Sequence, residues 1–395
     1  MLILRGHKFS LQNALNKVFG ALDKLSLVPT ASAYCQARQK IDPALFQELT
    51  ASIAEDFYRF SEEEGSVVTW HGHRLLGADG SKLTLPDTEA LREIYTVQRN
   101  QLTETVQAMS VVLYDLRNDL ALGARIGPLI AEKQYLFDLW EHTQSGDVLV
   151  LDRHFADYCV IAYSFHSGRE LVIRCPQQSF GVVRDFFASK RREQIIDLPC
   201  PQTPSTRVFV KEHKLPMKVR VRLLKFMLPT GETEVLLTTL CDQQQYPTSE
   251  FYQVYGWRWG NETYYDRLKN IFEVERFSGT SPHVIEQDFY AIVFLTTLES
   301  VLTKSAQETL NQRDQQRQNQ TEAKVNRALS YVNLCDRVVE LLADPYIDLE
   351  TVRDELHRLF LQTPTRHPPD RQYPRKKRAH STRLRFIKYF KRIIA

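Results

Sequence analysis

Four polar or amphipathic side chains that could do chemistry on a phosphodiester recur at helical spacing between residues 249 and 272. They are Tyr255, Arg258, Glu262 and Lys269. At about 100° per residue, the four positions fall on one arc of about 60° around a helix. Such a stripe suits a phosphate backbone lying along the helix, with one acid inside the contact. The competing interpretation is a solvated helix face that carries an ordinary Glu–Arg pair four residues apart.

Two aspartates add carboxylates to this pattern. Asp79 follows the apolar segment 75–78, and Asp152 follows the apolar segment 148–151. A lone aspartate after a strand is usually a cap or turn residue, but two such strands in one sheet, together with Glu262, favour a shared site. Three converging carboxylates are the oxygen ligands that Mg²⁺ or Mn²⁺ prefers. Two such ions, about 3.5–4 Å apart, can activate a water on one side of a phosphodiester and stabilise the leaving oxygen on the other.

The elements that must position these residues change type along the first half of the chain. Apolar spacing predicts helices up to about residue 62, with a break and a helix N-cap at 29–32. Helices are also expected at 129–142 and 155–165. Strands are expected at 66–70, 74–79, 106–113, 120–126, 147–152 and 170–174. This order predicts a mixed α/β fold with helices packed on a sheet.

The second half begins with a different texture. Short strands at 208–211, 219–223 and 234–240 are separated by proline and glycine, which predicts an all-β insertion over 176–246 rather than a continuation of the sheet. The helix with the polar stripe follows. A long helix at 282–312, a polar linker at 312–321 and helices from 327 to 362 are then expected.

Composition sets the outer limits. A chain of 395 residues with 43% hydrophobic residues indicates a globular protein of more than one domain. No apolar run reaches the ~18 residues of a membrane span, and the opening apolar segment is too short for a signal peptide. The six cysteines are scattered, which indicates neither a zinc site nor a disulfide framework and favours a reducing compartment.

The net charge of +3 conceals a basic C-terminal tail. Residues 371–395 contain ten Lys or Arg and no acid, and without them 41 basic residues face 48 acidic ones. Such a tail indicates a nucleic-acid arm, or less often a membrane-surface segment or a solubilising end. Its aromatic residues Phe386, Tyr389 and Phe390 favour a helix that packs or docks.

The order of these motifs resembles the DDE transposases of bacterial insertion sequences, in the insertion-sequence-four branch with a Tyr-Arg-Glu-Lys signature. The shared order is two aspartates, a β-rich insertion and Y-x-x-R-x-x-x-E-x-x-x-x-x-x-K on a helix. Segments 78–81, 151–155 and 258–263 resemble the three segments around the family's acids, and segments 32–40 and 275–279 resemble flanking ones. The resemblance covers roughly residues 30 to 300.

The resemblance implies a fold and a set of site residues. The fold is a ribonuclease-H-like mixed sheet with flanking helices, interrupted by an all-β insertion, plus helical N- and C-terminal regions. Asp79, Asp152 and Glu262 match the catalytic triad, which binds Mg²⁺ or Mn²⁺, with two ions expected. The remaining signature positions match residues that hold DNA phosphates around a flipped base: Tyr255, Arg258 and Lys269. Some members stack an aromatic from the insertion on that base, and the sequence assigns no residue to that role here.

The resemblance also implies a domain organisation. We expect a helical DNA-binding region at 1–64, a catalytic core at 65–175, the β-strand insertion at 176–246, the second part of the core at 247–312, and a helical region with the basic tail at 313–395. Family members usually have a longer segment before the match at Ser32, so N-terminal truncation is an expectation as well.

The implied activity is metal-dependent cleavage of DNA at transposon ends, followed by strand transfer. The expected partners are double-stranded DNA, both terminal inverted repeats and target DNA, and a second copy of the chain bound to that DNA. No membrane contact is expected, and the expected location is the prokaryotic cytoplasm at the nucleoid. Two alternatives stay open: a ribonuclease-H-like nuclease without strand transfer, and a catalytically decayed copy that only binds DNA.

Several neighbouring residues receive structural roles. Trp257 and Trp259 are expected to pack, and Gly256 and Gly260 are expected to allow a close approach of another element. His154 lies two residues after Asp152 in the chain, and both a role near the metals and a structural role are open for it.

Overall fold

The computed structural model describes residues 2–5, 10–99, 104–228, 231–319, 321–343 and 346–366. The chain divides into two units. The sheet unit contains residues 58–82 and 109–265, and the helical unit contains residues 1–57, 83–108 and 266–395. The basic tail at 371–395, with the helix expected around Phe386, lies outside the described residues.

Five strands form the first part of the sheet. They are β1 (Leu75–Thr84), β3 (Glu104–Asp115), β4 (Leu120–Gly127), β5 (Val148–Leu151) and β6 (Glu170–Arg174), in the order β4-β3-β1-β5-β6. β3 and β4 form the predicted antiparallel hairpin, whereas β1, β5 and β6 are parallel. All four residues of β5 are fully buried, as expected for a parallel strand that is covered on both faces. The predicted mixed α/β fold is confirmed.

Three further strands extend the same sheet. β9 (Thr233–Thr238) pairs antiparallel with β6, β8 (Lys218–Met227) pairs with β9, and β7 (Glu193–Pro199) pairs with β8. The segment 176–246 also contains helices α8 (Gly181–Ala188) and α9 (Pro204–Glu212). The prediction of an all-β insertion separate from the sheet is therefore wrong.

The mistaken strand at 208–211 has a local physical reason. Pro204 occupies the first turn of α9, where its missing N–H costs no hydrogen bond. Val210 faces the interior and is buried, while Val208 is 55% exposed. A short run of β-branched and aromatic residues cannot be assigned to strand or helix by periodicity alone.

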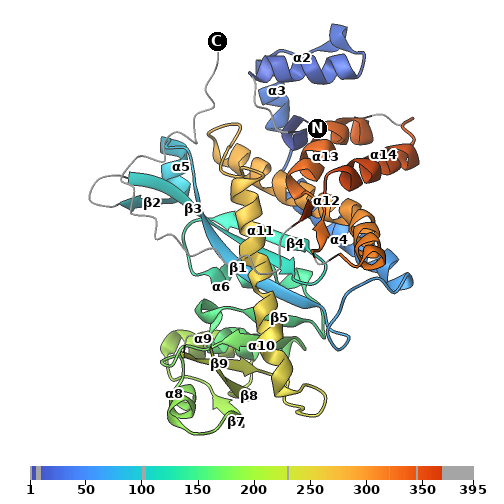
Figure 1. The fold of residues 1–395 in the computed structure, drawn as a ribbon. Coiled ribbons are helices and arrows are strands. Elements are labelled where there is room, and N and C mark those ends of the chain that lie inside the picture. The colour runs from blue at the N-terminus through green and yellow to red at the C-terminus, as the bar shows by residue number, and fades with distance from the viewer. Residues whose placement is uncertain are drawn as a thin grey trace. The chain divides into compact units, whose positions relative to one another are not determined.

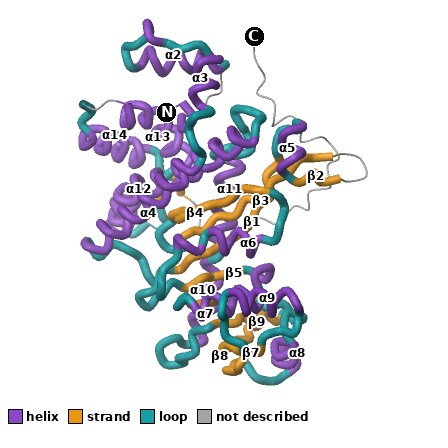
Figure 2. Tube along the Cα trace, turned by 180° about the vertical axis from the view of Figure 1, so that it is seen from behind, coloured by secondary structure: helices purple, strands orange, loops and turns teal. Residues whose placement is uncertain are grey.

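Helices cover the sheet within its unit. α10 (Thr248–Trp257) crosses the strands in Figure 1, and its Phe251 and Val254 join a buried cluster with Leu75 and Val148. The view from behind in Figure 2 shows α9 on the opposite side, where it contacts α7 (Tyr158–His166). α6 (Glu132–Asp138), η2 (Trp140–His142) and η3 (Arg153–Phe155) complete the connections, and α11 (Trp259–Asn270) follows α10.

The strand predicted at 66–70 is absent from the structure. Only an isolated bridge joins Trp70 to His73, around a turn in which His71 and Gly72 have φ of 49° and 81°. The Trp70 indole donates to the Glu250 carboxylate at 2.8 Å. The segment is therefore held as a loop by side-chain contacts.

The helical unit contains most of the remaining elements. They are α1 (Leu2–Arg5), α2 (Leu11–Ala21), η1 (Leu25–Leu27), α3 (Ala31–Arg38), α4 (Ala44–Glu63), α5 (Glu89–Ile94), β2 (Thr96–Arg99), α12 (Pro282–Arg317), β10 (Ala323–Lys324), α13 (Arg327–Ala343), α14 (Leu349–Gln362) and β11 (Thr365–Arg366). β2 pairs antiparallel with the first residues of β3, and β10 pairs antiparallel with β11.

The helices predicted for the N-terminal region and for 327–362 are confirmed. The Thr30 hydroxyl caps α3 by accepting from the Ala33 N–H at 3.2 Å, within the predicted break. Arg38 at the end of α3 is buried and pairs with Asp288 of α12 at 2.7 Å. α12 continues to Arg317 and ends at Gln318 in a left-handed conformation, so most of the linker predicted at 312–321 is helical.

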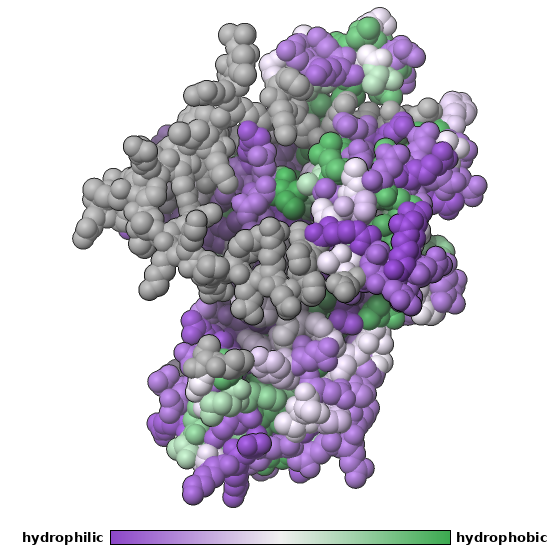
Figure 3. Space-filling view, in the orientation of Figure 1, coloured by the Kyte–Doolittle hydropathy of each residue, from purple (hydrophilic) through white to green (hydrophobic). Residues whose placement is uncertain are grey.

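The surface has no dominant apolar area on the face that Figure 3 shows, where hydrophilic side chains prevail and apolar ones form small patches. Exposed apolar residues such as Leu27, Val208 and Met227 come from different elements. Isolated exposed apolar residues of this kind are ordinary on folded proteins. None of the helices in the described part of the chain has the length and apolar character needed to cross a membrane.

Candidate active site

The parallel pairing of β1 with β5 brings the two aspartates to one edge. Ala78 of β1 pairs with Leu151 of β5. The residues that directly follow these two are Asp79 and Asp152. β5 ends at Leu151, whereas β1 continues to Thr84. The sequence had placed Asp79 after its strand, but in the structure Asp79 lies inside β1. Beyond Ala78, β1 therefore continues without pairing to β5.

Asp152 is fixed by its own backbone turn. It caps η3, with one carboxylate oxygen accepting from the His154 N–H at 2.8 Å. Its other oxygen lies 3.1 Å from Nδ1 of the His154 ring. The ring is well exposed and so reaches solvent beside the carboxylate.

The helix with the polar stripe is interrupted at Arg258. α10 ends at Trp257 and α11 begins at Trp259, and the Arg258 N–H donates to the Tyr255 carbonyl three residues earlier at 3.1 Å. Glycine is about 1 kcal/mol less favourable than alanine within a helix, and Gly256 and Gly260 flank the break. Gly260 has Leu116 at 3.4 Å from a hypothetical Cβ, but Gly256 faces open space. The predicted close packing is therefore wrong for Gly256.

Arg258 and Glu262 form an ion pair across this break. The guanidinium donates to Glu262 at 2.7 Å, and the side chains are 10% and 39% exposed, respectively. The Arg258 guanidinium carbon also lies 5.5 Å from the centre of the Tyr255 ring. The pair expected from the sequence therefore exists, but its arginine is buried and does not lie on a solvated face.

Three charged side chains act on the carboxyl group of Asp79, namely Asp152, Glu262 and Arg258. The pKa of Asp79 is raised to about 6, chiefly by burial and also by the charges of Asp152 and Glu262, while the charge of Arg258 opposes the rise. The carboxylate that the described residues bring within 4.8 Å of Asp152 and His154 is that of Glu132, and the predicted set of Asp79, Asp152 and Glu262 does not form such a cluster.

The other two members of the stripe lie differently. Tyr255 is 8% exposed and belongs to the buried cluster under α10, and this burial raises its pKa. Lys269 is half-buried in the last turn of α11, in the part of the helix that belongs to the helical unit. Trp257 packs as predicted, with the Arg117 guanidinium 4.0 Å from its ring centre, but Trp259 is 52% exposed.

One acid at this site was missed by the sequence reasoning. Glu132, in the first turn of α6, has a ligand atom that lies within 4.8 Å of those of Asp152 and His154. Burial, then Asp152, then Asp79 raise the pKa of Glu132, and His154 opposes the rise. The sequence offered no signal for it, because an acid in the first turn of a helix is ordinarily explained by the helix dipole.

Two glycines beside Asp79 leave room for this arrangement. A Cβ on Gly80 would lie 2.6 Å from the Glu132 carboxyl carbon, and a Cβ on Gly77 would lie 2.7 Å from the Asn261 amide nitrogen. Such distances are too short for real contacts, so a side chain at either position would force Glu132 or Asn261 to shift. The strand can therefore approach both α6 and α11 closely.

A buried tyrosine ties the helix of Glu262 to the strand of Asp79. The Tyr265 hydroxyl, one turn after Glu262, lies 3.1 Å from the Asp79 carbonyl and 2.9 Å from the Ser110 carbonyl. Its single proton can serve either acceptor. The bond fixes the height of α11 above β1 and β3.

Replacing Tyr265 with Phe should lower the free energy of unfolding by about 1–3 kcal/mol, because the buried carbonyl that accepts the hydroxyl proton loses this donor. Urea unfolding of the full chain measures the change. Tyr252→Phe, at a 49% exposed tyrosine of α10, is the matched control. Equal losses in the two variants would show that the Tyr265 hydroxyl contributes nothing specific.

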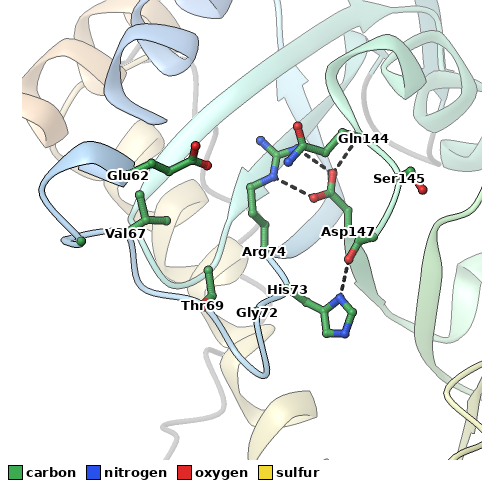
Figure 4. A pocket seen from close by; sticks show the side chains of 11 residues that line it. Glu62, Val67, Thr69, Gly72, His73, Arg74, Gln144, Ser145 and Asp147 are labelled. Atoms are coloured by element: carbon green, nitrogen blue, oxygen red, sulfur yellow. Dashed lines mark hydrogen bonds and ion pairs between the residues drawn. The ribbon is translucent and has the colours of Figure 1, made fainter. Parts of the chain in front are cut away.

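A pocket of about 480 Å³ lies at the other ends of β1 and β5 (Figure 4). Arg74, just before β1, donates two bonds to Asp147, just before β5, at 2.7 and 2.6 Å. His73, beside them, contacts the Gly146 carbonyl and the Tyr246 hydroxyl. These polar groups are occupied with one another and fasten the two strands, so the pocket has a structural explanation.

Comparisons with known proteins give little beyond this geometry. No protein-family model matches the chain. No curated protein matches it. Among solved structures, the cryo-EM structure of a piggyBac transposase synaptic complex with hairpin DNA is similar at 10% sequence identity and a TM-score of 0.41, over 91% of this chain and 74% of that one. A likeness of this degree identifies no family for the chain.

Proposed function

We propose that the chain is a DDE-type transposase, which cleaves DNA at transposon ends and joins the freed ends to target DNA. The observation that carries this proposal is the site at the edge of β1 and β5. Asp79 and Asp152 follow paired residues there, and the charges of Asp152, Glu262 and Arg258 all act on Asp79. These are the residues that the resemblance to the insertion-sequence-four branch singles out.

The topology supports the same proposal. The order β4-β3-β1-β5-β6, with an antiparallel hairpin followed by parallel strands, is the arrangement expected of a ribonuclease-H-like domain. The segment 176–246 lies between Asp152 and Glu262, as the resemblance implies, although it extends the sheet and contains α8 and α9. We propose the domain roles accordingly, with DNA binding assigned to the helical region at 1–64 and to the basic tail.

The residues at the site fit a divalent cation. The donors are carboxylates, and one oxygen of Glu132 is buried without a hydrogen-bond partner among the described residues. Bound Mg²⁺ or Mn²⁺, with two ions proposed, would supply Lewis-acid activation of water and of the scissile phosphate. Without such positive charge, the acids would repel an approaching phosphate.

The chain's own residues then have separate tasks. Asp79 and Asp152 hold their carboxylates at one edge, and Tyr265 sets the height of the helix that carries Glu262. Arg258 balances the acids in the DNA-free chain and can donate to a phosphate oxygen when Glu262 turns to a cation. If Arg258 exchanged Glu262 for a DNA phosphate, DNA binding would free Glu262 to bind the cation.

The DNA contacts remain proposals of the same kind. Lys269, on the helix of Glu262, is proposed to bind a backbone phosphate, and Tyr255 is proposed to support Arg258 from below, since its ring is buried. Two transposon ends must be held together for joining, so we propose a homodimer on DNA. Origin from a bacterial insertion sequence, and hence a location at the nucleoid, belongs to the same proposal.

The test is strand transfer of a labelled DNA end that carries the terminal repeats flanking the gene. With Mg²⁺, the wild type should nick the end and join it to a target plasmid, and Asp152→Ala should do neither. Asp138→Ala, at an exposed acid of α6, is the control and should behave as the wild type. Equal joining by the wild type and Asp152→Ala would remove Asp152 from the site, and cutting without joining would favour a nuclease.

A further inference from the structure

The Glu132 side chain is poorly satisfied by the protein. Its Oε2 is buried and has no hydrogen-bond partner among the described residues. A buried carboxylate oxygen without a donor or a cation is costly. Among the charges that act on this carboxyl group, Asp152 and Asp79 are negative, and His154 alone is positive when protonated. Thus, in the described part of the chain, the charges that act most strongly on this carboxyl group include no lysine or arginine.

The donors around this oxygen have the spacing of a cation site. One ligand atom each from Glu132, Asp152 and His154 lies within 4.8 Å of the other two. Two donors that bind one ion at about 2.0–2.2 Å can be at most about 4.4 Å apart. Donors at right angles on such an ion are about 3 Å apart, so side-chain rotations that move the ligand atoms by up to about 1–2 Å would close the site. The three residues come from α6, the end of β5 and η3, respectively.

The backbone of β1 is shaped to admit Glu132. A Cβ on Gly80 would lie 2.6 Å from Cγ, Cδ and Oε1 of Glu132, which is well inside van der Waals contact. Any other residue at position 80 would force the Glu132 carboxylate to move from this position. This observation is independent of the charges and concerns the residue directly after Asp79.

We propose that Glu132 is a further ligand for a divalent cation, which it binds together with Asp152 and His154. The inference deepens the proposed function, because the cation would share Asp152 with the proposed catalytic site. An imidazole donor favours Mn²⁺ over Mg²⁺, since Mg²⁺ prefers oxygen ligands alone. The site should accordingly bind Mn²⁺ more tightly than Mg²⁺.

The competing explanation is that Glu132 is protonated and merely fills space beside Gly80. A protonated Glu132 binds no cation, and Glu132→Gln would then imitate it closely. The two explanations therefore differ in cation affinity and not in stability.

The experiment is a Mn²⁺ titration of the full chain without DNA, after removal of metals with a chelator. Free Mn²⁺ is counted by electron paramagnetic resonance. Glu132→Gln should weaken one class of bound Mn²⁺ at least about tenfold, as expected for losing a ligand. His154→Ala, at an exposed ring, should weaken the same class and tests the site even if Glu132→Gln folds poorly. Glu141→Gln, at a 68% exposed acid of η2, is the control.

Unchanged Mn²⁺ affinity in both Glu132→Gln and His154→Ala would overturn the inference, and so would an equal loss in Glu141→Gln. A strand-transfer assay of the wild type separates this failure from failure of the proposed function. If the wild type joins DNA and Glu132→Gln binds Mn²⁺ normally, the result rejects Glu132 as a cation ligand and leaves the transposase proposal intact. If Mn²⁺ binds through Glu132 but the wild type never cuts DNA, the cation site stands and the transposase proposal falls.

Discussion

Asp79→Asn is expected to stabilise the metal-free protein while abolishing metal-dependent DNA cleavage. Burial and the neighbouring acids raise the pKa of Asp79 from 3.8 to about 6, so its ionised form is unfavourable in the folded chain. At about 1.4 kcal/mol per pH unit, this shift amounts to up to about 3 kcal/mol above pH 6. Asparagine removes the charge and keeps an oxygen that can accept from the Gly80 N–H, as Asp79 does at 2.9 Å.

The pH dependence follows from the direction of this shift. Below about pH 4 the carboxyl is protonated in both the folded and unfolded chains, so Asp79 carries no penalty there. Between pH 4 and about 6 the unfolded chain loses the proton first, so folding stability falls as the pH rises. The advantage of Asp79→Asn should therefore be absent near pH 4 and complete above about pH 6.

Urea unfolding in the presence of a chelator, at about pH 4 and about pH 7, measures this difference. Asp138→Asn, at an exposed acid, should show no stabilisation at either pH. If Asp79→Asn is no more stable than the wild type at neutral pH, the acids do not share a strained site in the metal-free chain. Retained cleavage by Asp79→Asn would contradict the catalytic role separately.

The sequence predicted the frame of this site well. The apolar segments before Asp79 and Asp152 indicated strands of one sheet, and the structure pairs them in parallel. Such predictions succeed because a strand that is buried on both faces must be apolar throughout. The strand at 170–174 was predicted with its observed limits for the same reason.

The remaining features depend on tertiary contacts that periodicity does not contain. Tyr255 was placed on a polar stripe, but its ring lies in the core cluster with Phe251 and Val254. Glu132 reaches the site only because Gly80 leaves space on another element. The strand expected at 208–211 became α9, since Pro204 and the contacts of Val210 decided between two local alternatives.

Arg258→Ala is expected to destabilise the DNA-free protein and to make it more dependent on divalent cations. Arg258 is 9% exposed, pairs with Glu262 at 2.7 Å and opposes the raised pKa of Asp79. Its removal leaves both acids without this charge. We expect a loss of about 2 kcal/mol, below the ~3–5 kcal/mol of a fully buried pair, because the Glu262 side chain is 39% exposed.

Cation binding distinguishes this role of Arg258 from a simple DNA contact. A cation placed among the acids replaces the missing guanidinium charge, so saturating Mn²⁺ should raise the melting temperature of Arg258→Ala more than that of the wild type. A residue that only holds DNA would leave both the metal-free stability and the Mn²⁺ response unchanged. Arg258→Lys should recover part of the stability, because it restores the charge but not the planar donor pair. If all three proteins unfold alike without DNA and respond alike to Mn²⁺, Arg258 does not balance the acids, and only its proposed contact with DNA phosphate remains.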